Sequence, residues 1–355
     1  MLGCQSQTLA TENLEPNTQN LTPRLVPKIA FVFPGQGSQT PGMGRDLWEH
    51  FACARAVFDE ADRATGFSLS RLCFEGPKEE LQLTANTQPA ILAVSVAAAE
   101  TLREKGIRPS YVAGHSLGEY SALVAAGAIR LPDALRLVRK RGQYMQDAVP
   151  KGEGTMAALM GLEPAAAEDI CREAAQGQVV SPANWNSPGQ IVIAGQAAAV
   201  QRAVDLAKTH GAKRSIVLNV SAPFHCALMR PAEERLAADL DTLDFSDLSV
   251  PLVNNVDALV VRTSAEARDG LKRQVTAPVR WEQSMRALRL QGVDWFVEVG
   301  PGRVLTGLLR QIDREATCLR AEDVRTIDET VARLRVGPGL GPAGGPTQGS
   351  ALHSQ

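Results

Sequence analysis

The chain has 355 residues, 44% of them hydrophobic and 21% charged, so it can bury a sizeable core in one or two domains. Its formal net charge of −2 gives no electrostatic reason to expect nucleic acid or a membrane surface as a partner. No apolar run reaches the length of a membrane span, and no secretion signal is evident. The six cysteines are scattered without C-x-x-C spacing, which predicts reduced thiols in a cytoplasmic protein and no zinc framework.

Both ends of the chain differ in composition from the rest. Residues 1–27 are rich in Thr, Asn, Gln and Pro and lack apolar periodicity, and residues 336–355 are rich in Gly and Pro. Neither segment can bury enough apolar surface to offset its chain entropy. We therefore predict two disordered tails that carry no chemistry.

From residue 28 to 150 the sequence predicts strands that alternate with helices. Apolar runs predict strands at 29–33 and 109–113, and helical patterns cover 44–64, 88–105, 119–127 and a stretch that begins at Pro132. Such alternation is typical of a parallel α/β sheet with helices on both faces. The chain returns to this pattern over 221–335, with strands expected at 252–255 and 295–299.

The pattern changes over residues 151–220. Strands are expected at 155–160, 178–184, 190–194 and 214–219, with helices at 164–176 and 196–209. The order β-α-β-β-α-β is the signature of a ferredoxin-like unit. The sequence thus predicts a small subdomain inserted into a large α/β subdomain.

The pentapeptide at 114–118 is a G-x-S-x-G motif centred on Ser116. A predicted strand precedes it and a predicted helix follows it, which is the context of a nucleophile elbow. The turn exposes the serine hydroxyl, and the helix N-terminus directs free N–H groups toward an oxyanion formed there. A structural turn is the alternative, but the flanking elements favour a nucleophile.

A serine nucleophile needs a base, and the chain has five histidines. His353 falls in the predicted tail, His50 at a polar helix end and His210 at a helix C-terminus, while the side chain of His115 must diverge from its neighbour Ser116. By elimination, we predict that His225 is the general base and acid.

Arg141 lies within an apolar stripe of the helix that begins at Pro132. It follows Leu137 by four positions and precedes Met145 by four, so its side chain is expected to face the core. A buried guanidinium must be paired. The partner is either a carboxylate of the protein, in a structural salt bridge, or a carboxylate of the substrate.

The loop 35–39, G-Q-G-S-Q, follows the first predicted strand. It lacks the lysine and the spacing of phosphate-binding loops. It can instead bring a second backbone N–H close to the acyl oxygen on the serine.

Together these segments resemble the malonyl-CoA:acyl carrier protein transacylase family, and they are similar to the acyltransferase domains of polyketide synthases. The matching segments follow the family's order over about 28–334, and lie at 33–39, 114–120, 141–142, 183–190, 222–226 and 298–302. The resemblance implies an α/β-hydrolase-like large subdomain that carries the ferredoxin-like one.

The resemblance also implies a role for each site residue. Ser116 would be the acylated nucleophile, His225 its base and Arg141 the ligand of the malonyl carboxylate. The backbone N–H groups of Gln36 and Leu117 would form the oxyanion hole, and the main-chain carbonyl of Gln274 would orient the histidine. Phe224 stands where several bacterial members have a smaller residue. In polyketide acyltransferases a Phe directly before the histidine goes with malonyl units, so the resemblance implies that Phe224 favours malonyl over methylmalonyl.

Function and partners follow from the same resemblance. We expect transfer of malonyl from malonyl-CoA to the phosphopantetheine thiol of holo acyl carrier protein, in support of fatty acid synthesis, by a monomer without metal or cofactor. Three alternatives stay open: a polyketide acyltransferase that acts in trans, a serine esterase or thioesterase, and a non-catalytic docking module for carrier protein. The esterases usually place an acid between the serine and a late histidine.

Overall fold

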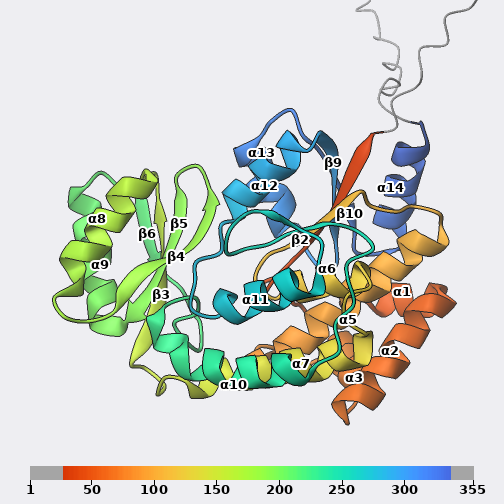
Figure 1. The fold of residues 1–355 in the computed structure, drawn as a ribbon, viewed down its shortest axis with the longest axis horizontal. Helices are drawn as coiled ribbons and strands as arrows, with labels where there is room; N and C mark the ends of the chain where they lie inside the picture. The colour runs from red at the N-terminus through yellow and green to blue at the C-terminus, as the bar shows by residue number, and fades with distance from the viewer. Residues whose placement is uncertain (1–26, 337–355) are drawn as a thin grey trace, which may run out of the picture.

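The computed structural model describes residues 27–336. Most of the two predicted tails therefore lies outside the described residues, as do Cys4 and His353. Within them, two sheets and their helices form the architecture that Figure 1 shows. None of the helices in this part of the chain is both long and apolar enough to cross a membrane.

The larger sheet has six strands in the order β10-β9-β1-β2-β7-β8. Neighbours from β10 to β7 are parallel, as predicted, whereas β8 pairs antiparallel with β7 because the two form a hairpin. A wholly parallel sheet is thus wrong at this edge. The strands are β1 (Lys28–Phe33), β2 (Tyr111–Gly114), β7 (Leu252–Val253), β8 (Val260–Val261), β9 (Val293–Val299) and β10 (Thr317–Ala321).

Helices cover both faces of this sheet. Side chains alternate along each strand, so each strand contributes residues to a core on either face. Phe31 and Phe33 of β1 join the core that holds α5 and α7, while Ala30 and Val32 join the core of α12 and α13. The helices before the second sheet are α1 (Arg45–His50), α2 (Ala52–Thr65), α3 (Leu69–Glu75), α4 (Lys78–Leu81), α5 (Thr84–Glu104), α6 (Gly118–Ala125) and α7 (Leu131–Asp147). Those after it are η1 (Ala227–Met229), α10 (Arg230–Thr242), α11 (Ser264–Gln274), α12 (Trp281–Leu290), α13 (Val304–Ile312) and α14 (Val324–Val336).

The smaller sheet is antiparallel, with the strand order β4-β5-β3-β6. Its elements are β3 (Gly154–Met160), α8 (Pro164–Ala175), β4 (Val180–Ser187), β5 (Gln190–Gln196), α9 (Ala197–Thr209) and β6 (Arg214–Val217). Ala157 and Leu159 of β3 pack under α8 and α9, and Met156 and Ala158 join the core of the large sheet. One face of the small sheet is therefore turned toward the larger body.

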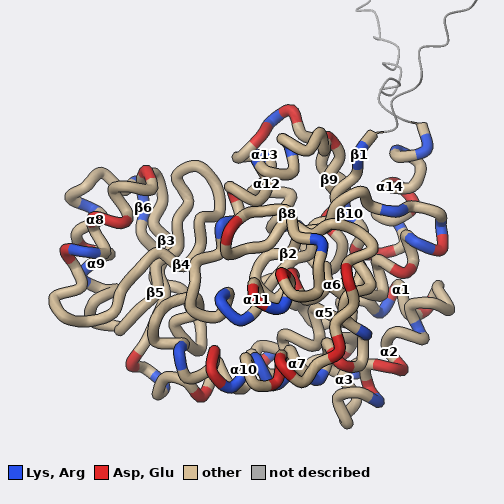
Figure 2. Tube along the Cα trace, in the orientation of Figure 1, with Lys and Arg blue, Asp and Glu red and all other residues tan. Residues whose placement is uncertain are grey.

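Backbone hydrogen bonds join the small sheet to the segment between α11 and α12 of the larger body. The Trp185 N–H donates to the Val279 carbonyl oxygen at 2.9 Å, and the Val279 N–H donates to the Ala183 carbonyl oxygen at 2.9 Å. Both signs of charge are interspersed along α7 and α10 (Figure 2), and Lys140 pairs with Asp239 at 2.7 Å between them. Charge thus lies on the outer helices, and the region between the sheets is available for a less polar site.

Candidate active site

Ser116 stands on the tight turn between β2 and α6, as the motif predicts. Its φ is 51°, a left-handed conformation that is uncommon for residues other than glycine. A Cβ on Gly114 would collide with the backbone of Gly118, and one on Gly118 would collide with the Phe33 carbonyl oxygen of β1. The two glycines are therefore needed so that β1, the turn and α6 can pack together.

His225 contacts Ser116 directly, as the elimination of the other histidines predicts. The Ser116 hydroxyl donates to His225 Nε2 at 2.7 Å, and His225 Nδ1 donates to the Gln274 carbonyl oxygen at 2.9 Å. The carbonyl can only accept, so it holds the proton of the neutral ring on Nδ1 and leaves Nε2 free to take the serine proton. Gln274 thus occupies the position that the resemblance implies.

Burial and, after it, the positive charge of Arg141 together lower the pKa of His225 to about 3. The ring is therefore neutral near pH 7, which is the protonation state of a general base. None of the other described histidines hydrogen-bonds the Ser116 side chain, although His115 lines the same cavity. His50 and His210 bond to backbone carbonyls at helix ends, and His115 Nε2 bonds Asn186 Oδ1 at 2.9 Å.

Arg141 is buried on α7, with 2% of its surface exposed. Its guanidinium donates to Gln88 Oε1 at 2.9 Å, to Gln274 Oε1 at 2.9 Å and to Ser116 Oγ at 3.1 Å. Among the described residues no carboxylate lies within ion-pair distance of it. The structural salt bridge is thus absent from this part of the chain, and the charge faces the nucleophile.

Gln36 and Leu117 line the same cavity as Ser116. Within residues 27–336, neither backbone N–H donates to a protein acceptor. Leu117 precedes the first turn of α6, where free N–H groups and the positive end of the helix dipole gather. Both groups are available to an oxyanion formed beside Ser116.

Three residues that the sequence did not single out complete the site. Asn255 forms hydrogen bonds to two residues of the elbow. Its side chain accepts from the Ser116 N–H at 2.7 Å and donates to the Gly114 carbonyl oxygen at 2.6 Å. Gln88 holds Arg141, and Glu119 accepts from the Gln274 side chain at 2.9 Å. The sequence could have indicated two of these residues by their position alone. Gln88 interrupts an apolar helix, and Glu119 directly follows the motif.

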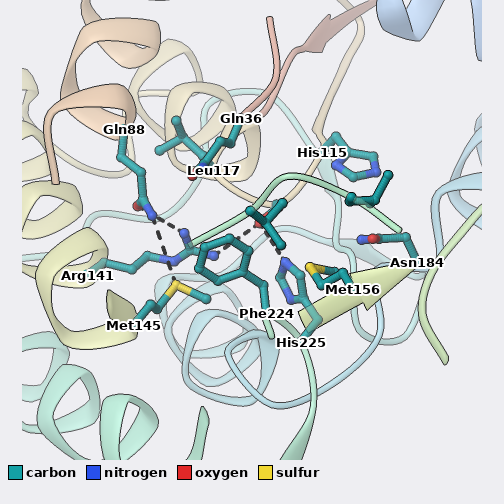
Figure 3. A pocket seen from close by; sticks show the side chains of 13 residues that line it. Gln36, Gln88, His115, Leu117, Arg141, Met145, Met156, Asn184, Phe224 and His225 are labelled. Carbon is teal, nitrogen blue, oxygen red and sulfur yellow. Dashed lines mark hydrogen bonds between the residues drawn. The ribbon is translucent and has the colours of Figure 1, made fainter. Parts of the chain in front are cut away.

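The cavity has a volume of about 140 Å³ and lies between the two sheets. Figure 3 shows Arg141 and Gln88 on one side, His225 and Met156 on the other, and the Phe224 ring between them in this view. Cys226, beside the histidine, is buried with its thiol on the Pro223 carbonyl, and burial raises its pKa to about 11, so it is a poor nucleophile. Among the described residues no cluster of His, Cys, Asp and Glu could hold a metal ion.

A serine that donates to a neutral histidine at the carboxyl edge of parallel strands is typical of enzymes that transfer or hydrolyse acyl groups. Known proteins agree with this class. A family model described as an acyl transferase domain matches residues 30–330. The malonyl CoA-acyl carrier protein transacylase of Bacillus subtilis (strain 168) is 48% identical over 309 residues, which cover 87% of this chain and 98% of the relative.

Solved structures give the same result. The malonyl CoA-acyl carrier protein transacylase of Coxiella burnetii has a TM-score of 0.85 at 44% identity, with 87% of this chain and 98% of that one covered. A malonyl-transacylase in complex with its type II polyketide synthase acyl carrier protein has a TM-score of 0.84 at 47% identity, with 86% and 99% covered. The chain belongs to the acyl transferase family, in the group of malonyl CoA-acyl carrier protein transacylases.

Proposed function

We propose that this chain transfers the malonyl group of malonyl-CoA to the phosphopantetheine thiol of an acyl carrier protein through a malonyl ester on Ser116. The observation that carries the proposal is the buried guanidinium of Arg141, which points at the nucleophile without a carboxylate partner in the described part of the chain. Such a site favours an acyl group that ends in a carboxylate. The names of the relatives support the same donor and acceptor.

In the first half-reaction, Ser116 Oγ attacks the thioester carbon while His225 Nε2 takes its proton. The guanidinium of Arg141 would bind the malonyl carboxylate in a bidentate manner. The N–H groups of Gln36 and Leu117 would stabilise the oxyanion of the tetrahedral intermediate. Collapse of that intermediate breaks the carbon–sulfur bond, and the CoA thiolate takes the proton from His225.

The second half-reaction reverses these roles. His225 takes the proton of the carrier thiol, and the thiolate attacks the malonyl ester. The carbon–oxygen bond to Ser116 breaks, and its oxygen recovers the proton from His225. Water could attack the same ester, so the apolar wall formed by Met145, Met156 and Phe224 supports transfer by limiting access of water.

Fold, location and assembly complete the proposal. The strand order β4-β5-β3-β6 supports a ferredoxin-like subdomain at 151–220, inserted into an α/β-hydrolase-like subdomain at 28–150 and 221–335. Five free thiols among the described residues support a reducing, cytoplasmic location. We expect no cofactor to be needed, since Ser116 and His225 supply the nucleophile and the proton transfer, and we keep the monomer as an expectation from the resemblance.

Two pathways would use this chemistry. Fatty acid synthesis is the first candidate, and a polyketide acyltransferase acting in trans is the second, because one similar structure holds a type II polyketide synthase carrier protein. Malonyl transfer measured to one carrier protein of each kind separates the two. The esterase alternative predicts release of free malonate at the same rate with and without carrier protein.

Replacement of Ser116 by Ala tests the covalent intermediate. The hydroxyl that donates to His225 at 2.7 Å is then absent, so no ester can form. We expect intact-protein mass spectrometry to show a malonyl adduct on the wild type after incubation with malonyl-CoA, and none on Ser116→Ala. A persistent adduct on that variant would assign the nucleophile elsewhere.

Phe224 bears on the choice of acyl group. It lines the cavity directly before His225, so its ring limits the space beside the acyl chain. We expect Phe224→Ser to raise methylmalonyl transfer relative to malonyl about tenfold, a typical discrimination for one methyl group in a tight pocket. Competition between the two CoA esters measures this ratio, and an unchanged ratio would remove Phe224 from specificity.

A further inference from the structure

We propose that Glu119 is a positioning residue that holds Arg141 in its substrate-binding direction through the side chain of Gln274. The inference rests on the proposed function, because it assigns a purpose to the carboxylate-binding role of Arg141. Glu119 follows the nucleophile motif on α6 and does not face the cavity itself.

The carboxylate of Glu119 is fully buried, and one of its oxygens accepts two hydrogen bonds. Oε2 accepts from the Asn255 N–H at 3.0 Å and from Gln274 Nε2 at 2.9 Å. Both donors belong to segments that contact the elbow. Burial of a carboxylate is costly, and these two hydrogen bonds to Oε2 offset part of that cost.

Gln274 carries the effect of Glu119 to Arg141. Its amide is bonded at both ends: Nε2 donates to Glu119 Oε2 and to the Ser116 carbonyl at 3.0 Å, and Oε1 accepts from Arg141 at 2.9 Å. Three acceptors lie on the Nε2 side: Glu119 Oε2, the Ser116 carbonyl oxygen and, at 3.3 Å, Asn255 Oδ1. Glu119 supplies the shortest of these contacts, and its acceptor oxygen favours the NH₂ group on that side of the amide. A rotated amide would turn its NH₂ group toward the guanidinium, where both groups are donors.

Arg141 depends on that orientation. Its side-chain acceptors other than the nucleophile are Gln88 Oε1 and Gln274 Oε1, one on each side. Without the Gln274 acceptor, the guanidinium keeps Gln88 Oε1 and the Tyr120 ring, 5.3 Å from its Cζ, and is directed less firmly at Ser116. Protonation does not break the link, since Oε2 keeps both hydrogen bonds when the proton is on Oε1. The acceptor oxygen, and not the charge, is thus what positions Arg141.

The experiment compares Glu119→Leu, which has no acceptor, with Glu119→Gln, which keeps one. The readout is kcat/KM for Ser116 acylation by malonyl-CoA divided by that for acetyl-CoA. Arg141→Ala sets the scale, and we expect it to lower this selectivity on the order of a hundredfold, as for loss of a buried charge pair. If Arg141→Ala leaves the selectivity unchanged, the proposed function of Arg141 fails before Glu119 is tested.

We expect Glu119→Leu to lower the selectivity about tenfold, as for loss of one charge-assisted hydrogen bond, and Glu119→Gln to recover most of it. Gln274→Leu, which keeps the main-chain carbonyl for His225, should give the same loss. In the Arg141→Ala background, Glu119→Leu should lower the selectivity no further. This second route through Gln274 keeps the test valid if Glu119→Leu does not fold.

Glu298→Leu is the matched control. Glu298 is also buried and accepts two backbone N–H groups, at the start of α13, but it does not line the cavity. Its loss should lower the melting temperature and leave the selectivity unchanged. Equal losses of malonyl and acetyl transfer in Glu119→Leu, or no rescue by Glu119→Gln, would overturn the inference.

Discussion

The reacting atoms of Ser116 and His225 are held by strained backbone. The two residues have φ values of 51° and 60°, in the left-handed region that most side chains avoid. Such conformations persist only where the surroundings fix them, and here Asn255 bonds the Ser116 N–H while Gln274 bonds the histidine ring. The 2.7 Å contact between nucleophile and base is therefore set before substrate binds.

The charge of Arg141 adds to burial in lowering the basicity of His225. Burial and then Arg141 lower the histidine pKa to about 3, so the wild-type ring stays neutral as the pH falls from 8 to 5. Acylation should show no loss from histidine protonation in that range. In Arg141→Gln the charge is absent, so the pKa rises toward 6.5 and the activity should fall at a higher pH than in the wild type.

Single-turnover acylation by acetyl-CoA between pH 4 and 8 measures both profiles without a substrate carboxylate. Glu298→Gln, remote from the cavity, serves as the control for a general effect of pH on the fold. A wild-type acid limb near pH 6.5 would contradict the assigned effect of burial and of Arg141 on His225.

Among the site residues, the sequence pointed to the groups with distinctive chemistry and, through the resemblance, to Gln274 beside the histidine, but it missed the other residues that orient them. Ser116 carries a motif, His225 was one of few histidines, and Arg141 violated an apolar stripe. Gln88 and Asn255 are neutral amides that meet the site through contacts far apart in the chain. No local pattern marks such a contact, because it exists only once the strands and helices are assembled.

Among the elements, α6 controls the position of the elbow because it lies against β1. A Cβ on Gly118 would meet the Phe33 carbonyl oxygen, and backbone cannot give way cheaply. We expect Gly118→Ala to lower the free energy of unfolding by about 1–3 kcal/mol, the usual cost of overpacking. Displacement of the turn by about 1 Å should also lower kcat/KM on the order of a hundredfold.

Gly307→Ala is the control for this prediction. Gly307 lies within α13, and a Cβ there would meet nothing within 4 Å. Alanine should stabilise that helix by about 0.5–1 kcal/mol and leave the rate unchanged. Chemical denaturation and steady-state transfer measure both variants, and a Gly118→Ala protein with wild-type rate would show that α6 does not set the elbow.

The elements most easily predicted were those with long, regular patterns. The alternation from β1 to α7 and the six-element order of the small sheet both follow the sequence closely. β7 was expected at 252–255 and is shorter, Leu252–Val253. β8 has two residues, too few for any period to show, and it forms because the hairpin supplies β7 as its partner. The antiparallel edge could not be predicted for the same reason.

In the whole molecule, the cavity exists only where the two sheets meet. Ser116 and Arg141 come from the larger body, whereas Met156 of β3 and Asn184 of β4 come from the smaller sheet. His115 bonds Asn186 across the junction at 2.9 Å. The sequence predicted both bodies but not this packing, because it depends on side chains from strands far apart in the chain.

We therefore expect the small sheet to control the ratio between hydrolysis of the malonyl ester by water and its transfer to a thiol. Met156 is buried and forms part of the cavity wall on the β3 side. We expect Met156→Ala to cost about 2–5 kcal/mol of stability and to open space for water beside the ester. Free malonate, measured against malonyl carrier protein in one assay, should rise several-fold relative to transfer, because excluded water is what protects such intermediates. Met229→Ala gives the comparison, since Met229 is equally buried but lies outside the cavity lining. If both variants lose stability while the ratio of hydrolysis to transfer stays at the wild-type value, the small sheet shapes the cavity without protecting the ester.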